Sequence, residues 1–225
     1  MYNITLIGTR HEELGRCNSN ELYKIIENIN PEIIFEEIPP SYFEKYYIIK
    51  NHKNLESNVI NKYLEHYSIK NISVDSENIP SESLVQKYNA LHNRIEGLTD
   101  TNGFHYRTLT DQYRSQIAIY GFIYLNCIYC INYYNEITKA IENGLQKINK
   151  DDLFQTYELW KDINENRENE MLRNIYDYSK AHSYNRAIFT IGAGHRKSLM
   201  QKIQKYEREE NFKLNWTFYD GLDNK

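Results

Sequence analysis

The sequence predicts an α/β protein with a central, mostly parallel sheet flanked by helices and a large helical insertion before the last two strands. Short apolar runs alternate with helical periodicity over the first eighty residues, a pattern typical of parallel βαβ units. The same alternation returns near the C-terminus, whereas the segment between shows helical periodicity only. We treat 1–225 as a single α/β domain with 81–182 as an insertion, because neither end could bury both faces of its strands alone.

Each element follows from a local signal. Apolar runs predict strands, and residues recurring three and four apart predict helices. Ser19 or Asn20 can cap the first helix, which Pro31 ends, and Pro39-Pro40 enforces a loop. The expected strands are 3–8, 33–37, 72–75, 187–191 and 214–219. The expected helices after the first are 41–50, 55–67, several between 81 and 182 with an interruption near 97–103, and 195–208.

Composition and charge exclude several classes of protein. Forty per cent hydrophobic and 26% charged residues are ordinary for a globular chain. The net charge of -4 is mixed along the sequence and forms no basic stripe, so we expect no nucleic-acid partner and no anionic membrane surface. The N-terminus carries no secretory signal, and three cysteines do not make a disulfide framework. These features favour a cytoplasmic location.

The apolar segment 117–131 raises the question of a membrane. Its 15 residues, which include Asn126, would span about 22 Å as a helix at ~1.5 Å per residue. A bilayer core is about 30 Å thick, so we expect no stable membrane insertion. The Tyr-rich stretch 120–134 is more simply a core helix or the face of a homo-oligomer.

The two ends of the chain resemble each other. Residues 4–11 read Ile-Thr-Leu-Ile-Gly-Thr-Arg-His, and residues 188–195 read Ile-Phe-Thr-Ile-Gly-Ala-Gly-His, so four of eight positions agree. Each copy leads through a helix to a strand that ends in acid. Glu37 lies 26 residues after His11, and Asp220 lies 25 residues after His195.

This repeat predicts a site at one edge of the sheet. Ligands of open parallel sheets bind beyond the carboxyl ends of the strands, and a glycine there allows a tight turn and close approach of the backbone to a ligand. We therefore expect the strands ending at Gly8 and Gly192 to be parallel neighbours, with His11, His195 and Glu37 at the same edge. Such a group can hold a divalent metal, Mn²⁺, Co²⁺ or Zn²⁺, or supply a neutral imidazole base oriented by a carboxylate.

Other residues near this edge are weaker candidates. Glu37 is preferred to Glu36 because it ends the strand, on the opposite side from Glu36. Asp75 ends the third strand and is expected to bind substrate or to cap a turn, and Arg10 to bind an anionic group or to be solvated. Cys127 and Cys130 are expected to be buried core residues. The remaining histidines show no metal-ligand spacing: His52, His66, His92, His105 and His182.

These motifs resemble the TraB/PrgY/TIKI superfamily, which also takes in erythromycin esterase and ChaN-like proteins. The matching segments are the two Gly-x-x-His motifs, Pro31-Glu32-Ile33-Ile34-Phe35-Glu36-Glu37, and Arg167 within Asn166-Arg167-Glu168-Asn169-Glu170-Met171. We expect the protein to differ from the membrane-bound members in having no C-terminal hydrophobic spans, and from TIKI proteins in having no secretion signal. The resemblance implies a hydrolase-like site in which Arg167 takes part; TIKI members are metal-dependent proteases, the esterases use a histidine base, and ChaN-like proteins bind haem.

Together these observations predict a hydrolase acting on a peptide or ester bond of a small-molecule or peptide substrate. The residues expected to act in catalysis are His11, Glu37, His195 and Arg167, and those expected to contact substrate are Arg10, Asp75, Gly8 and Gly192. The metal, if required, would be held by His11, Glu37 and His195. The alternative is a small-molecule, peptide or haem binding protein that uses the same crevice without turnover.

Overall fold

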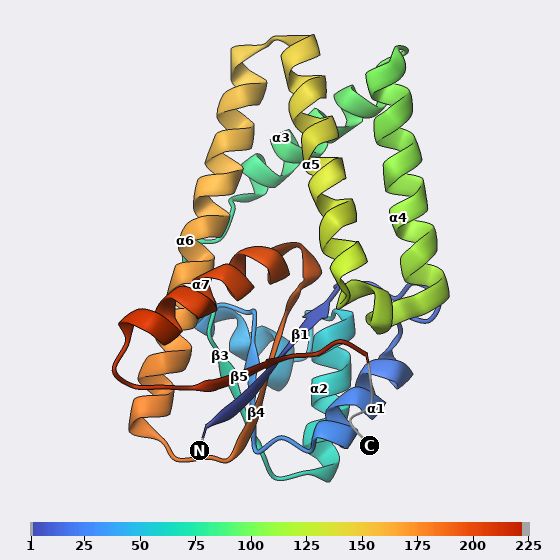
Figure 1. Cartoon of the computed structure of the whole chain (residues 1–225). Helices are drawn as coiled ribbons and strands as arrows, with labels where there is room; N and C mark the ends of the chain where they lie inside the picture. The colour runs from blue at the N-terminus through green and yellow to red at the C-terminus, as the bar shows by residue number, and fades with distance from the viewer. Residues whose placement is uncertain (1, 222–225) are drawn as a thin grey trace.

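The computed structural model describes residues 2–221 and contains one five-stranded sheet in which every pairing is parallel (Figure 1). The strand order is β3-β2-β4-β1-β5. The α/β class and the parallel sheet are therefore as predicted. The strands are β1 (Asn3–Thr9), β2 (Ile33–Glu36), β3 (Lys70–Ser73), β4 (Arg186–Gly192) and β5 (Asn215–Phe218).

Helices cover both faces of the sheet and form the expected insertion between β3 and β4. Those near the sheet are α1 (Ser19–Ile29), α2 (Leu55–His66) and α7 (Arg196–Glu209); those of the insertion are α3 (Glu82–Glu96), α4 (Thr101–Leu125), α5 (Ile128–Ile148) and α6 (Asp151–Ala181). In Figure 1, α4, α5 and the first half of α6 rise beyond the sheet, and α3 crosses between them. These helices share a core of their own, which includes Leu91, Leu109, Ile141 and Tyr157.

Three local predictions differ from the structure. The third strand, expected over 72–75, is Lys70–Ser73, so Asp75 follows it by two residues. The N-cap of α1 is Asn18, whose side chain accepts a hydrogen bond from the backbone N–H of Glu21, and not Ser19 or Asn20. The helix expected over 41–50 is a short 3₁₀ turn, Pro40–Tyr42, followed by a π-helical turn, Glu44–Ile48. The wider π turn places Tyr47 under the sheet, where its hydroxyl donates to the carboxylate of Glu36.

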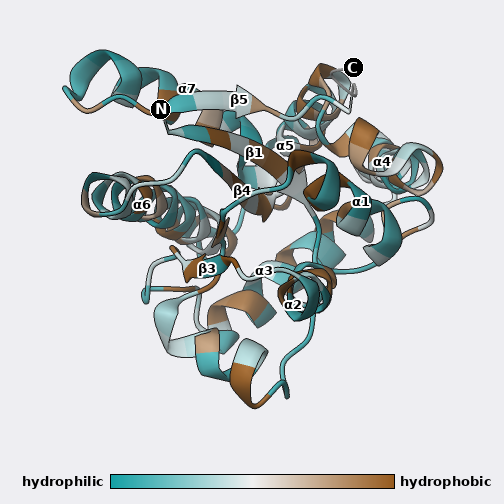
Figure 2. Ribbon diagram, turned by 90° about the horizontal axis from the view of Figure 1, so that it is seen from below, coloured by the Kyte–Doolittle hydropathy of each residue, from teal (hydrophilic) through white to brown (hydrophobic). Residues whose placement is uncertain are grey.

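The strand order places a switch point between β1 and β4. The connection from β1 to β2 passes over β4, and the connection from β4 to β5 passes over β1 in the opposite direction. Because such crossovers are right-handed, α1 and α7 lie on opposite faces of the sheet, as Figure 2 shows. Leu22 of α1 belongs to one core layer and Leu199 of α7 to the other. Ligands bind at the carboxyl ends of strands where crossovers diverge.

The segment 117–131 is broken into two helices. Gly121 has a φ of 57°, and a side chain there would lie only 2.6 Å from the carbonyl oxygen of Arg16. The turn at Asn126 and Cys127 then separates α4 from α5. Within residues 2–221, no helix combines the length and the hydrophobicity needed to cross a bilayer.

Candidate functional site

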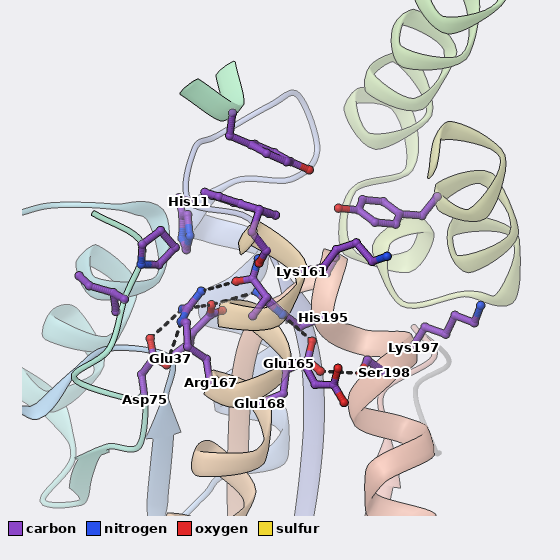
Figure 3. Close-up of a pocket in the computed structure, with 18 of the residues that line it drawn as sticks. His11, Glu37, Asp75, Lys161, Glu165, Arg167, Glu168, His195, Lys197 and Ser198 are labelled. Carbon is purple, nitrogen blue, oxygen red and sulfur yellow. Dashed lines mark hydrogen bonds and ion pairs between the residues drawn. The ribbon is translucent and has the colours of Figure 1, made fainter. Parts of the chain in front are cut away.

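The two Gly-x-x-His motifs follow neighbouring strands, as predicted. Strands β1 and β4 pair in parallel with Gly8 opposite Ile191 and Thr9 opposite Gly192. Glu37 follows β2, the other neighbour of β4. A cavity of about 1230 Å³ opens at this edge, and His11, Glu37 and His195 all line it, with Asp75 from the end of β3 (Figure 3).

Arg167 of α6 joins two of the strand ends. Its Nη2 lies 2.8 Å from Oε1 of Glu37 and 2.7 Å from Oδ2 of Asp75, and its Nε lies 3.1 Å from Oδ1 of Asp75. A fourth contact, from Nη1 to Oδ1 of Asn164 at 2.9 Å, fixes the guanidinium plane. The Arg167 side chain is only 12% exposed. Arg167 therefore binds two carboxylates from a buried position and does not form a surface ion pair.

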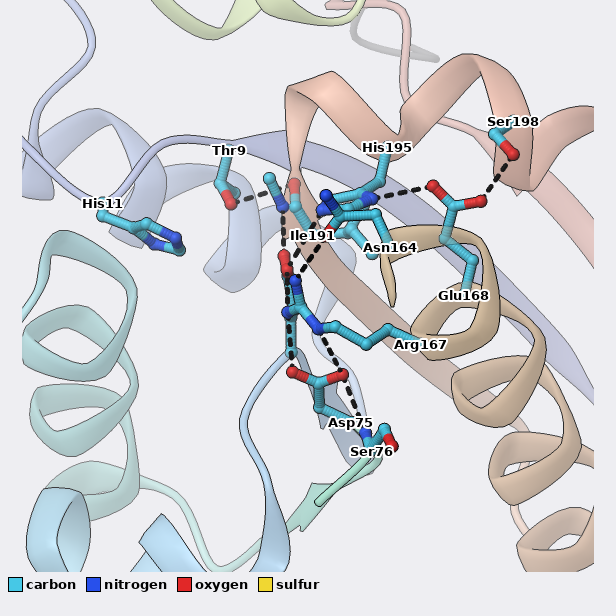
Figure 4. A network of polar contacts seen from close by, with 12 residues as sticks. Thr9, His11, Asp75, Ser76, Asn164, Arg167, Glu168, Ile191, His195 and Ser198 are labelled. Carbon is cyan, nitrogen blue, oxygen red and sulfur yellow. Dashed lines mark hydrogen bonds and ion pairs between the residues drawn. The ribbon is translucent and has the colours of Figure 1, made fainter. Parts of the chain in front are cut away.

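His195 lies between two carboxylates (Figure 4). Its Nδ1 is 2.7 Å from Oε1 of Glu168, and its Nε2 is 3.4 Å from Oε1 of Glu37. Glu168 also accepts from the Ser198 hydroxyl at 2.5 Å and from the Lys202 ammonium at 3.2 Å. Burial lowers the pKa of His195, but the charges of Glu37 and Glu168 outweigh burial and raise it above 6.5. The imidazole is thus held in place, and its two carboxylate neighbours favour its charged form.

Gly192 fixes the position of Glu37. Its backbone N–H donates to Oε2 of Glu37 at 2.6 Å, and a Cβ at this position would lie 3.3 Å from the same oxygen. Burial raises the pKa of Glu37, but His195, Arg167 and the Gly192 N–H more than offset it, so the pKa is lowered. Burial raises the pKa of Asp75, which Arg167 offsets only in part.

His11 has a different environment. Its Nδ1 lies 3.4 Å from Oε1 of Glu56 on α2, and the Thr9 hydroxyl donates to the same oxygen at 2.7 Å. The His11 side chain is 62% exposed. No residue between 2 and 221 makes a hydrogen bond with its Nε2. The hydrogen bond with Glu56 raises the pKa of His11 to about 9, against the effect of burial; Glu37 also raises it and Arg167 lowers it.

Glu36 and Glu37 lie on opposite faces. Glu37 meets His195 and Arg167, whereas Glu36 is buried on the α2 side, where it accepts from Tyr47 and, at 3.0 Å, from Asn71. Burial raises the pKa of Glu36 to about 7. The geometry therefore places Glu37 at the cavity, the residue preferred for its position at the strand end, and Glu36, the fallback, on the other face.

Several candidates lie elsewhere. Arg10 contacts Glu12 at 3.8 Å and does not line the cavity. Gly8 is clamped by Asn126, whose side chain accepts from its N–H at 2.7 Å and donates to its carbonyl at 2.9 Å. Gly8 therefore packs α4 against β1. Asp220 acts electrostatically on Arg196 and is not a lining residue.

Sequence reasoning missed the two carboxylates that orient the histidines. Glu168 is 5% exposed and Glu56 is 4% exposed. Glu168 continues the buried stripe of Leu172, Ile175 and Ser179 along α6, and Glu56 continues that of Val59 and Tyr63 along α2. An acidic residue where the helical period calls for an apolar one was the available signal.

The metal-ligating side chains of the site are already engaged with one another. Among residues 2–221, no three His, Cys, Asp or Glu side chains are placed to hold an ion. Both nitrogens of His195 face carboxylates, and Glu37 is occupied by Arg167 and the Gly192 N–H. The positive charge that these carboxylates need comes from Arg167. The ion expected at His11, Glu37 and His195 stays a prediction.

Comparisons with known proteins add one distant likeness. No family model and no curated protein match the sequence. Among solved structures, an erythromycin esterase mutant in its open conformation is similar, with a TM-score of 0.40 and 11% identity over 96% of this chain and 69% of that chain.

Proposed function

We propose that the protein is a hydrolase of ester or peptide bonds in which His11 is the general base. The observation that carries this proposal is the His11–Glu56 pair. A carboxylate holds one ring nitrogen, while the other has no protein partner within the described residues and lies in a cavity. A base needs this combination of a fixed tautomer and a free nitrogen.

The proposed step needs no metal. Nε2 of neutral His11 takes a proton from a water whose oxygen attacks the carbonyl carbon, and the resulting imidazolium returns that proton to the leaving alcohol or amine. Arg167 and His195 line the same cavity as His11. The guanidinium, and the imidazole when it is protonated, would favour the negative charge that develops on the carbonyl oxygen. Glu37 and Glu168 position these two groups.

The motifs that resemble the TraB/PrgY/TIKI superfamily agree with this proposal, including the part given to Arg167. The resemblance also implies a metal-dependent form of the hydrolase. Calorimetric titration of the protein with Mn²⁺, Co²⁺ and Zn²⁺ tests this form. Cys17, Cys127 and Cys130 are free thiols, which supports the cytoplasmic location expected from the sequence.

Hydrolysis of 4-nitrophenyl acetate and of its peptide analogues tests the base directly. His11→Gln should lower kcat/KM by about 10²- to 10⁴-fold, the usual contribution of a general base. His182→Gln, an exposed histidine at the end of α6, is the matched control and should leave kcat/KM unchanged. Equal activity of His11→Gln and wild type would exclude His11 as the base.

The pH profile tests the role of Glu56. Only neutral His11 accepts a proton, so kcat/KM should rise with pH up to the raised pKa of His11, about 9. Glu56→Gln removes the charge that raises this pKa, so the rising limb should move toward the ordinary value of 6.5. An unchanged limb in Glu56→Gln would show that another group titrates.

The size of the cavity favours a second candidate, a binding protein without turnover for a small molecule, a peptide or haem. A volume of about 1230 Å³ exceeds what a water and one reacting bond need. Ligand-induced thermal stabilisation without hydrolysis of any ester or peptide would favour this candidate over the hydrolase.

A further inference from the structure

The wall of the cavity has two unlike parts. The sheet edge contributes the two histidines with Glu37 and Asp75, and the helical insertion contributes aromatic side chains from three helices. Tyr88 of α3 stacks on Trp160 of α6, with ring centroids 4.0 Å apart and planes 9° from parallel. Tyr134 of α5 completes this aromatic wall. Aromatic rings that line a cavity can bind flat apolar groups.

The aromatic wall is tied to the second histidine motif. The Tyr134 hydroxyl would lie 3.0 Å from a Cβ at Gly194, so the ring rests against the backbone just before His195. A side chain at this position would force the Tyr134 ring to shift by a few tenths of an ångström. A flat group on the aromatic wall would therefore share a cavity with His195 and His11.

Lysines form a second recognition element on the same cavity. Lys161 of α6 and Lys197, Lys202 and Lys205 of α7 all line it. Figure 3 shows Lys161 and Lys197 extending toward the same side. This concentration is unexpected in a chain whose net charge is -4.

The protein itself neutralises only part of this charge. Lys202 is paired with Glu168, and Lys161 with the exposed Glu158 at 3.2 Å. Lys197 contacts the neutral Asn135 at 2.9 Å. Glu37, Asp75 and Glu168 are already matched by Arg167, His195 and Lys202, which leaves Glu165 as the other acid on this wall. The α6–α7 side therefore keeps an excess of positive charge.

We propose that the cavity takes an amphipathic anion, whose flat apolar part stacks on Trp160 and Tyr88 and whose carboxylate, sulfonate or phosphate group binds Lys197 and Lys205. As a statement about substrate, this inference rests on the proposed hydrolase. The preferred ester or amide would then carry both a ring and an anionic group. The binding of such an anion is measurable without turnover.

Calorimetric binding of naphthalene-2-sulfonate and of neutral 2-naphthol to the full chain separates the two elements. The sulfonate should bind about tenfold more tightly, as expected for two partly screened ion pairs. In Lys197→Gln/Lys205→Gln this preference should disappear, and added salt should weaken it in wild type. Trp160→Ala should weaken both probes alike.

The matched control is Lys24→Gln/Lys62→Gln, which removes the same charge from exposed positions on α1 and α2. It should keep the preference for the sulfonate. Equal binding of the two probes by wild type, or equal loss in both double variants, would overturn the inference.

Failure of this inference is distinguishable from failure of the proposed function. His11-dependent hydrolysis of 4-nitrophenyl acetate without lysine-dependent sulfonate binding would retain the hydrolase and overturn the amphipathic anion. Lysine-dependent sulfonate binding without hydrolysis of any ester or peptide would support the anion site and overturn the hydrolase.

Discussion

The two histidine motifs are alike in sequence and unlike in structure. Both follow neighbouring parallel strands through a Gly-x-x-His turn. His11 is 62% exposed and contacts one carboxylate, whereas His195 is 18% exposed and lies between two. An open imidazole can exchange a proton with a ligand, and an enclosed one is suited to hold its neighbours in place.

The two histidines differ in exposure because different helices cover the two faces of the sheet. The carboxylate of His11 comes from α2, and Glu36 and Tyr47 lie on the same face. The carboxylate of His195 comes from α6, which also supplies Arg167. The helical insertion thus encloses one half of the site with α6 and leaves the other open. Repeated strand ends can therefore take on different tasks when different helices cover them.

Replacing Arg167, in the enclosed half of the site around His195, should produce the largest loss of unfolding free energy. Arg167→Met leaves the buried carboxylates of Glu37 and Asp75 without their cation, which typically costs about 3 to 5 kcal/mol of unfolding free energy. Urea denaturation measures the loss. Arg173→Met, on the same helix with a 62% exposed side chain, is the control and should change stability by no more than about 0.5 kcal/mol. If Arg167→Met lost no more stability than Arg173→Met, the carboxylates of Glu37 and Asp75 would be solvated.

The adjacent acids Glu36 and Glu37 should respond in opposite directions. The folded pKa of Glu36, about 7, is above its ordinary 4.5, so its contribution to stability is full below pH 4.5 and is lost as pH rises through 7. Glu36→Gln removes the loss of stability at high pH, because the amide does not ionise. Its oxygen can still accept from Tyr47 and Asn71. At pH 8 it should be more stable than wild type by up to about 3 kcal/mol.

The matched variant Glu37→Gln should destabilise. The pKa of Glu37 is lowered, so its contribution is present above the ordinary pKa and is lost as pH falls. Denaturation of both variants from pH 4 to pH 8 measures the two slopes. Slopes of the same sign would contradict the separation of these acids onto two faces.

Much of the fold was predictable because it depends on local patterns. The apolar runs at Asn3–Thr9 and Arg186–Gly192 form strands whose pairing followed from their repeated sequence. The turn around Tyr47 was not predictable, because a π-helical turn has the same apolar spacing as a short helix. The break at Asn126 depends on its contact with Gly8, 118 residues away.

The site was predictable where a residue follows a strand and hidden where it lies on a helix. Glu37 and Asp75 were accessible from strand alternation and strand ends. Glu56 and Glu168 come from helices whose facing direction depends on packing, and only their place in an apolar stripe marks them. Arg167 was found through the family resemblance, because its buried contacts span 92 and 130 residues of sequence.

The smallest expected effect distinguishes the two histidines by their contribution to stability. The folded pKa of His195 is raised above 6.5, so its contribution is full below pH 6.5 and is lost as pH rises through the folded pKa. His195→Gln should cost about 1.5 kcal/mol at pH 6, near the lower end for hydrogen bonds to charged groups, because Glu37 and Glu168 keep other partners. The deficit should shrink at alkaline pH. His11→Gln should cost no more than about 0.5 kcal/mol, since solvent screens its exposed ion pair. Thermal denaturation of both variants at several pH values measures the difference, and an equal cost for the two substitutions would mean that the halves of the site are enclosed alike.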